Sequence, residues 1–195
     1  MTRRLLVISA IVVSMVALWG APAAAQAPKA QAPVLLTSCG QSPGPDRVKV
    51  FLMRLGVQYE YKTDATAKDL AAGIFKTVII VTGSSLKGMG AAGVSITDEL
   101  KRTEALIAEA KKRGVMIIGA HVEGMERRAR NAAPGDNSDE QSIDTVCPKS
   151  AILIVRKDGD EDGRFTTIAK SKNIPLLLFE KNLELSALLK NLFAK

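Results

Sequence analysis

The chain has few of the residues from which catalytic and metal sites are most often built, and few aromatic residues. Its 195 residues include one histidine, two cysteines, one tryptophan, two tyrosines and five phenylalanines. A single histidine with no cysteine near it in the sequence does not favour a zinc site. So few aromatic rings offer no stacking platform for nucleic acid, and basic residues are spread along the chain beside acids, so no nucleic-acid partner is expected.

Residues 1–25 have the pattern of a secretion signal. Arg3 and Arg4 precede an uncharged apolar run from Leu5 to Trp19, which ends in a stretch of small residues. The run is shorter than the roughly 20 apolar residues that span a bilayer, and small-residue endings of this kind are cleaved by signal peptidase. We therefore expect cleavage after Ala25, a periplasmic or secreted location, and no stable membrane insertion of the product. Without the two arginines, the 27 basic residues become 25 against 20 acids, a net charge of +5.

The rest of the chain is predicted to be a flexible leader, residues 26–33, followed by a single domain, residues 34–195. Within the domain, short apolar runs alternate with segments that have the 3.6-residue period of a helix. The continuous runs Thr77–Thr82 and Val115–Gly119 are typical of strands buried on both faces. Such an alternation predicts a three-layer, doubly wound α/β domain with a mainly parallel sheet of five or six strands, flavodoxin-like or Rossmann-like. The expected strands are Val34–Thr37, Val57–Tyr61, Thr77–Thr82, Val115–Gly119, Ala151–Val155 and Pro175–Phe179.

In such folds ligands bind beyond the carboxyl ends of the strands. The loops at that edge begin near Ser38, Gly83, His121 and Asp158. Cys39 lies in the first of these loops, whereas Cys147 precedes a strand, which places it at the opposite edge. Because a strand of about five residues spans ~17 Å, we expect no disulfide between them.

The segment Gly83–Gly93 is the richest of these loops. It follows a buried strand and offers main-chain N–H groups, two hydroxyls and one ammonium, which suits an anion. Its glycines match two phosphate-binding motifs only in part. The match to the dinucleotide-binding motif begins too far from the end of the strand, and the match to the phosphate loop lacks the Lys-Ser/Thr pair. A flexible turn without a ligand is the alternative. The candidate ligand-binding residues are Ser38, Gln41, Ser42, Gly83, Ser84, Ser85, Lys87, Gly88, Gly90, His121 and Arg127.

Two further groups of residues allow both a functional and a structural interpretation. His121 directly follows a predicted strand and is the natural acid or base at neutral pH, or else a structural histidine. Arg127 and Arg128, with Glu123 and Glu126, could form an anion clamp or a salt-bridged helix face, for example between Glu123 and Arg127.

The acidic run that contains Asp158, Asp160 and Asp162 resembles the opening of a calcium loop. Position 12 of that loop would be Ala169 instead of the bidentate glutamate. A solvated acidic turn before a helix is therefore favoured over a weak calcium site, and no other metal or cofactor is expected.

Several sequence segments, taken together, resemble those of an uncharacterised family of exported bacterial and archaeal proteins, domain of unknown function 6305. They are Leu36–Pro43, Gly83–Gly93, Ala120–Gly124 with Arg127 and Arg128, and Asp158–Thr166. The resemblance covers nearly all of Val34–Phe193 and implies a Rossmann-like α/β domain without an established activity. Cys39 stands where the family is expected to have a small residue.

Three functions remain open from the sequence. The first is an exported protein that binds a small polar or anionic ligand at the carboxyl edge of the sheet. The second is a periplasmic hydrolase with His121 as the base, although the Gly-x-Ser-x-Gly motif is absent. The third is a protein-interaction module.

Overall fold

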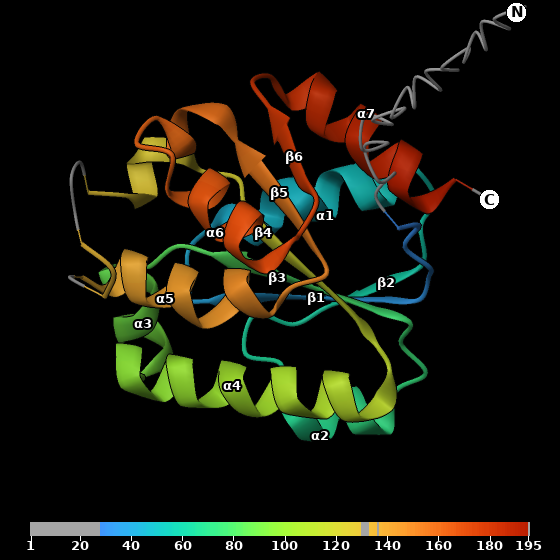
Figure 1. Cartoon of the computed structure of the whole chain (residues 1–195). Coiled ribbons are helices and arrows are strands. Elements are labelled where there is room, and N and C mark those ends of the chain that lie inside the picture. The colour runs from blue at the N-terminus through green and yellow to red at the C-terminus, as the bar shows by residue number, and fades with distance from the viewer. Residues whose placement is uncertain (1–27, 130–132, 136, 195) are drawn as a thin grey trace, which may run out of the picture.

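The computed structural model describes residues 28–129, 133–135 and 137–194 (Figure 1). The predicted signal, residues 1–25, and the first two leader residues lie outside this range. The strands are β1 Val34–Cys39, β2 Tyr59–Tyr61, β3 Thr77–Thr82, β4 Met116–His121, β5 Ile152–Arg156 and β6 Leu176–Phe179. The helices are α1 Gly44–Arg54, α2 Ala67–Ala72, α3 Leu86–Ala92, α4 Ile96–Arg113, α5 Ser138–Val146, α6 Arg164–Lys172 and α7 Asn182–Phe193, with short 3-10 helices at Gly124–Arg127, Cys147–Lys149 and Lys157–Asp160.

The strands form one parallel sheet in the order β2-β1-β3-β4-β5-β6. The predicted three-layer α/β fold is confirmed. Because β1 lies between β2 and β3, the winding of the chain reverses between β1 and β3, as in flavodoxin-like folds. These two central strands pair from Val34 opposite Thr77 to Cys39 opposite Thr82, and all of their residues are buried. The continuous apolar runs in the sequence thus correspond to strands covered on both faces.

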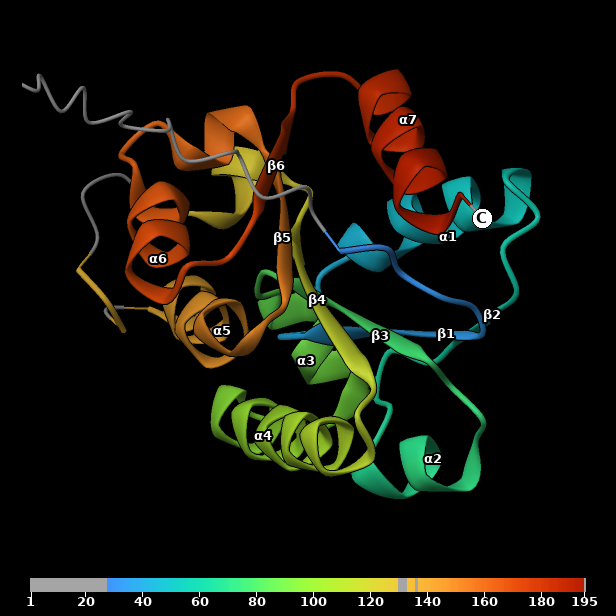
Figure 2. The same cartoon turned by 45° about the vertical axis from the view of Figure 1, so that its right-hand side comes forward.

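Helices cover both faces of the sheet (Figures 1 and 2). Helices α1 and α7 pack on one face, where Leu52 and Leu189 join the core beneath β1 and β4. On the other face, α2 and α4 cover β1 and β3, whereas α5 and α6 cover β5. Apolar burial on both sides holds the strands in place, so their carboxyl ends form a fixed edge.

Helix α3 is a difference from the sequence analysis, which expected the whole Gly83–Gly93 segment to be a loop. Ser85 is the N-cap, and its side chain accepts a hydrogen bond from the N–H of Gly88 at 3.0 Å. Gly93 ends the helix in the left-handed conformation, with φ of 67°. A cap at each end compensates for the poor helix propensity of the internal glycines.

The described part of the predicted leader, residues 28–33, is hydrogen-bonded to the domain. The N–H of Ala30 donates to the carbonyl of Leu192 at 2.9 Å, and Gln31 bonds the hydroxyl of Thr77 through its main chain. These bonds attach Ala30 and Gln31 to α7 and β3. None of the helices in the described ranges is long and apolar enough to cross a membrane.

Both cysteines are free, as predicted, and both are buried. Burial raises the pKa of the Cys39 thiol to about 12 and raises the pKa of Cys147 as well. Cys39 ends β1, whereas Cys147 begins the short 3-10 helix that precedes β5.

Candidate functional site

The loops selected from the sequence meet at the carboxyl edge of the sheet. His121 is the last residue of β4, and Cys39 and Thr82 end β1 and β3. In folds with this strand order, ligands bind where the winding reverses, which here is the space between the loops after β1 and β3. We call residues 40–44, 83–85 and 121–127 the switch-point edge.

The loops after β1 and β3, which are two of the three segments of the switch-point edge, are bonded to each other. The N–H of Ser85 donates to the carbonyl of Gly40 at 2.8 Å, and Gln41 and Ser84 form an antiparallel bridge. A Cβ on Gly40 would lie 2.7 Å from the carbonyl oxygen of Gly83, so only glycine permits this approach. Gln41 has a φ of 57°, a conformation that residues with a side chain rarely adopt and that is often found at binding sites.

Main-chain N–H groups of these loops donate to carboxylates of the protein itself. The pairs are Gly40 N with Glu99 Oε2 at 2.9 Å, Gly44 N with Glu123 Oε2 at 3.1 Å, and Ser84 N with Asp139 Oδ1 at 2.6 Å. Hydrogen bonds to ionised acceptors are stronger than those between neutral groups. The amides that could bind an anionic ligand therefore bind anionic side chains that approach from α4, α5 and the loop after β4.

Two of these carboxylates are paired with arginines. Arg102 donates to Glu99 through Nε at 3.0 Å and Nη2 at 2.9 Å. The same guanidinium reaches the carbonyls of Ala65 at 2.7 Å and Ser38 at 2.6 Å. Arg102 thus joins α4 to the end of β1 and to the segment after β2.

Arg127 forms the pair predicted with Glu123 four residues earlier, with Nε 3.2 Å from Oε1. Its Nη1 also donates to the carbonyl of Ser84 at 3.0 Å, so it crosses from the loop after β4 to the loop after β3. The side chain of Arg127 is 29% exposed, whereas that of Glu123 is 3% exposed. Arg127 is consequently a cation that solvent can reach at the switch-point edge.

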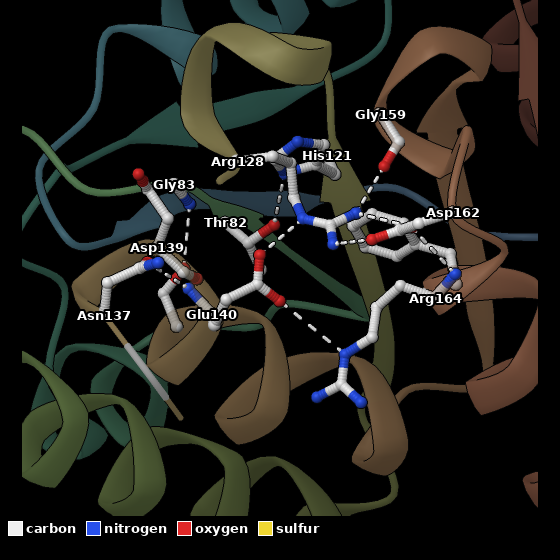
Figure 3. Close-up of polar contacts among 12 residues, drawn as sticks. Thr82, Gly83, His121, Arg128, Asn137, Asp139, Glu140, Gly159, Asp162 and Arg164 are labelled. Carbon is white, nitrogen blue, oxygen red and sulfur yellow. Dashed lines mark hydrogen bonds and ion pairs between the residues drawn. The ribbon is translucent and has the colours of Figure 1, made fainter. Parts of the chain in front are cut away.

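Arg128 does not act as the second arm of an anion clamp, because its side chain is completely buried (Figure 3). Nε donates to Glu140 at 2.5 Å, Nη1 to the carbonyl of Gly159 at 2.5 Å, and Nη2 to Asp162 at 2.6 Å. Its guanidinium also lies over the ring of Phe165, 5.5 Å from the centroid. This network joins the loops after β4 and β5 to α5.

The three aspartates of the expected calcium loop are directed to different partners. Asp158 forms two hydrogen bonds with Arg156 at 2.7 and 2.5 Å, and these bonds lower the pKa of its carboxyl. Asp160 accepts from the N–H groups of Phe165 and Thr166 at the start of α6, and Asp162 binds Arg128, as described above. No cluster of three or more metal-ligating side chains occurs in the described parts of the chain.

His121 is buried and both of its ring nitrogens are within hydrogen-bonding distance of a partner. Nε2 lies 3.0 Å from the carbonyl of Gly124, which can only accept, so Nε2 carries the proton. Nδ1 is then the acceptor for the hydroxyl of Thr82 at 3.1 Å. Burial lowers the pKa of His121 to about 4. A neutral histidine that is fixed and shielded from solvent fits a structural role and gives no support to a catalytic base.

The remaining candidates fall into exposed and enclosed groups. Lys87, on α3, is exposed and makes no ion pair within the described ranges. The amide of Gln41 is half-buried and donates to the carbonyl of Thr63 at 3.3 Å. Ser38 is buried, and its Oγ has no hydrogen-bond partner among the described residues. Ser42 accepts from the N–H of Gly44 at 3.3 Å.

Further candidate positions have their polar groups bonded within the protein. The pairs are Gly83 N with Ser142 Oγ, Ser84 Oγ with Ser138 Oγ, and Gly88 N with Ser85 Oγ.

Four residues that organise this edge were not predicted from the sequence: Glu99, Arg102, Asp139 and Glu140. Glu99 and Asp139 lie in the first turns of α4 and α5, where acids are common for reasons unrelated to function. Their partners are 59 and 55 residues away in the chain, so no local pattern predicts the contacts.

The strand order and the carboxyl edge define a flavodoxin-like α/β domain. The chain belongs to the family described as Domain of unknown function (DUF6305), whose model matches residues 31–193. None of the curated proteins matches it.

Solved structures with some similarity include two hydrolases. A GDSL-like lipase from Bacteroides thetaiotaomicron is 12% identical, with 74% of this chain and 66% of the lipase covered and a TM-score of 0.36. The esterase EstA from Pseudoalteromonas sp. is 11% identical, with 82% of this chain and 91% of the esterase covered and a TM-score of 0.34. Likenesses this distant carry no argument about the activity of this chain.

Proposed function

We propose that the protein is an exported binding protein that holds a small polar or anionic ligand at the switch-point edge without changing it chemically. The observation that carries the proposal is the set of loop amides occupied by Glu99, Glu123 and Asp139. This arrangement supports the proposal because the main chain of these loops is already oriented for acidic oxygens.

Arg127 is the proposed anchor for the ligand. It borders both switch-point loops, and two of its five N–H donors are used by Glu123 and the Ser84 carbonyl. The remaining donors of a guanidinium can bind a carboxylate or phosphate. Lys87 and Gln41 supply a further charge and a further polar group on the same edge.

Asp139 is the carboxylate best suited to yield its place to a ligand. Burial raises the pKa of Asp139, so the ionised carboxylate is held at a cost, whereas its hydrogen bond with the N–H of Ser84 favours ionisation. An oxyanion that replaced Asp139 at this N–H would also lie close to Arg127, which bonds the carbonyl of the same residue.

The proposal favours binding over hydrolysis. A hydrolase of the kind considered above requires His121 to accept a proton from a nucleophile, but the ring is enclosed and its free lone pair is directed to Thr82. The alternative of a periplasmic hydrolase therefore has no supporting observation in the site.

Binding can be tested by thermal unfolding and calorimetry with inorganic phosphate and a panel of carboxylates that includes citrate. We expect stabilisation of the wild type, a loss of about 1–2 kcal/mol of binding free energy in Lys87→Gln, and tighter binding in Asp139→Asn, which removes a competing charge. Lys111→Gln is the matched control. Lys111 is an exposed lysine in the last turn of α4, at the end of the helix away from the switch-point edge, so this variant should bind normally. Absence of stabilisation by every anion, or equal binding by all variants, would overturn the proposal.

Export is a separate part of the proposal. Protein recovered from the periplasm should begin at or near Gln26 and contain no tryptophan, because Trp19 is the only one. N-terminal sequencing that finds Met1 on membrane-bound protein would contradict it.

A further inference from the structure

Basic residues that are distant in the sequence gather at one end of the molecule. Helices α1, α4 and α7 end on the side where β1, β3 and β4 begin, on the right of Figure 1. Main-chain hydrogen bonds join the segments there. The N–H of Lys76 donates to the carbonyl of Pro33 at 2.9 Å, and the N–H of Met116 donates to the carbonyl of Lys76 at 3.0 Å. The amino-edge face, as we call this end, consists of residues 28–33, 51–60, 73–76, 109–115 and 190–194.

The amino-edge face carries the net positive charge of the domain. Its basic residues are Lys29, Arg54, Lys76, Lys111, Lys112, Arg113 and Lys190, and its acids are Glu60 and Glu109, a net charge of +5. The chain after residue 25 has 25 basic and 20 acidic residues, so its whole excess lies on this face and the other residues balance. Helix dipoles favour cations in the last turn of a helix. Lys29 and Lys76 lie outside helices, so dipoles alone do not account for the face.

These cations are accessible to an external anion, because all of them are exposed. Lys112 and Arg113 share a single acid, Glu109, at 3.7 and 3.2 Å. Lys29 donates to the carbonyl of Asn191 at 2.6 Å, which leaves its charge uncompensated. The others form no ion pair in the described ranges: Arg54, Lys76, Lys111 and Lys190. The face therefore has cations available for an anionic partner.

Apolar side chains are exposed among these charges. Ile74, in the loop before β3, is 77% exposed, and Met53, in the last turn of α1, is 61% exposed. Two hollows open on the same face. The first, of about 530 Å³, is lined by residues that include Pro33, Ile74, Phe75, Lys76, Arg113 and Val115. The second, of about 740 Å³, is lined by residues that include Lys29, Leu55, Val57 and Phe193. No acid among the described residues lines either hollow, so each combines apolar walls with positive charge.

We propose that the amino-edge face attaches the protein to a membrane surface that contains anionic phospholipid. Phosphate groups of the lipid bind the cations, and Ile74 enters the region between the phosphates and the acyl chains. The attachment is peripheral, because none of the helices in the described ranges could span a bilayer. The carboxyl ends of the strands lie at the opposite edge of the sheet, so the switch-point edge faces away from the bilayer. The attachment is therefore independent of the ligand proposed above.

A bilayer accounts for both properties of this face. Anionic lipid attracts Lys and Arg, and each such residue near the surface strengthens binding by about fivefold. Apolar side chains exposed beside cations are unfavourable in water but fit the boundary between headgroups and acyl chains. Nucleic acid would account for the cations but not for the exposed Ile74 and Met53 among them.

Co-sedimentation with lipid vesicles tests the proposal on the protein purified with its own N-terminal segment. We expect binding to vesicles of mixed phosphatidylglycerol and phosphatidylcholine, little binding to phosphatidylcholine alone, and weaker binding as salt is added. Lys76→Gln combined with Lys190→Gln should weaken binding by about 20-fold, because two charges are lost from the face. The N-terminal segment is the same in every variant, so a difference between variants reports the folded domain.

The matched control is Lys101→Gln combined with Lys157→Gln, which removes the same net charge from elsewhere. Lys101 is exposed in the first half of α4, and Lys157 follows β5 in an exposed pair with Glu180. This variant should bind vesicles within about twofold of the wild type, since its lost charges face away from the lipid. Circular dichroism and thermal unfolding verify that both double variants are folded. Absence of binding by the wild type, or equal losses in the two variants, would overturn the proposal.

A fluorescent label tests whether the apolar part of the face contacts lipid. Ile74→Cys carrying a polarity-sensitive dye should shift its emission to the blue on phosphatidylglycerol vesicles. Leu86→Cys is the control, because Leu86 is 81% exposed on α3 at the opposite edge of the sheet, and its dye should not respond. A dye at residue 74 that stays in water while the protein is bound would overturn the proposal, since the face would then be a site for polyanions such as nucleic acid.

Discussion

Arg128 and Glu140 form an ion pair that is completely shielded from solvent. Nε of Arg128 lies 2.5 Å from Oε1 of Glu140, and neither side chain has exposed surface. Arg128 belongs to the loop after β4, and Glu140 lies in the first turn of α5 (Figure 3). The pair therefore attaches the helix that precedes β5 to the carboxyl edge of the sheet.

Replacement of Arg128 should be strongly destabilising. Arg128→Met leaves buried Glu140 with only the longer ion pair to Arg164, at 3.6 Å, and removes the donors to Gly159 and Asp162, so we expect a loss of about 3–5 kcal/mol in the free energy of unfolding. Urea denaturation measures this loss. Arg113→Met is the control, because Arg113 is 39% exposed and its partners, Glu109 and the carbonyl of Ala71, are reached at the surface, where a loss of about 1 kcal/mol or less is expected. Equal losses in the two variants would contradict a stabilising role for the buried network.

His121 should make the protein less stable as the pH falls below neutrality. Its pKa is about 4 in the folded protein, against an ordinary value of 6.5, so the unfolded chain takes up the proton first. The stabilisation is fully present above pH 6.5 and is lost as the pH falls toward 4. The difference between the two pKa values corresponds to roughly 3 kcal/mol.

The measurement is the free energy of unfolding as a function of pH for the wild type and for His121→Gln. Because His121 is the only histidine, the variant should lack this dependence. The raised pKa values of Asp139 and Glu140, caused by burial, act in the opposite sense, so the difference between the two proteins is the quantity to compare. Parallel curves would show that His121 titrates normally and is accessible to solvent.

The sequence predicted the sheet well because burial on both faces leaves a local signal. The run Thr77–Thr82 is continuous and apolar, and it is the fully buried β3. The same periodicity placed the loops after β1, β3, β4 and β5 at one edge. α3 was missed because its internal glycines have poor helix propensity, and the caps at Ser85 and Gly93 determine the structure instead.

The chemistry of the edge could be predicted only in part. Glu123 and Arg127 are four residues apart, so their pairing followed from helix geometry. Glu99 and Asp139 reach the loops from distant helices, and only the assembled fold brings them there. From the sequence, the main-chain N–H groups at the start of the Gly83–Gly93 segment were expected to be free for a ligand. Their acceptors lie on distant helices, and no local sequence pattern identifies them.

Both cysteines should be unreactive in the folded protein. Each is buried and has a raised pKa, so little thiolate forms and reagents cannot reach it. A thiol-specific disulfide reagent at mildly alkaline pH should modify neither until denaturant is added, and then both. Lys87→Cys, which adds a thiol at an exposed position, is the positive control. Rapid modification of a native thiol in the wild type would show that the interior opens more readily than the packing indicates.

Substitutions at Gly88 and Gly90 of α3 can distinguish the effect of packing on stability from the effect of helix propensity. A Cβ on Gly88 would lie 2.2 Å from the main-chain oxygen of Gln41, whereas a Cβ on Gly90 would have no atom within 4 Å. Both substitutions by alanine add one methyl group to the same helix and gain the same propensity, up to about 1 kcal/mol. Their difference therefore reports the contact between α3 and the loop after β1.

We expect Gly90→Ala to raise the free energy of unfolding by roughly 0.5–1 kcal/mol, and Gly88→Ala to lower it by about 1–3 kcal/mol, because the Gln41 carbonyl must move. Urea denaturation of both variants measures the two effects. Loss of ligand binding in a Gly88 variant would consequently reflect displacement of Gln41, and it should be accompanied by this loss of stability. If Gly88→Ala were as stable as Gly90→Ala, α3 would not pack on the switch-point edge as described.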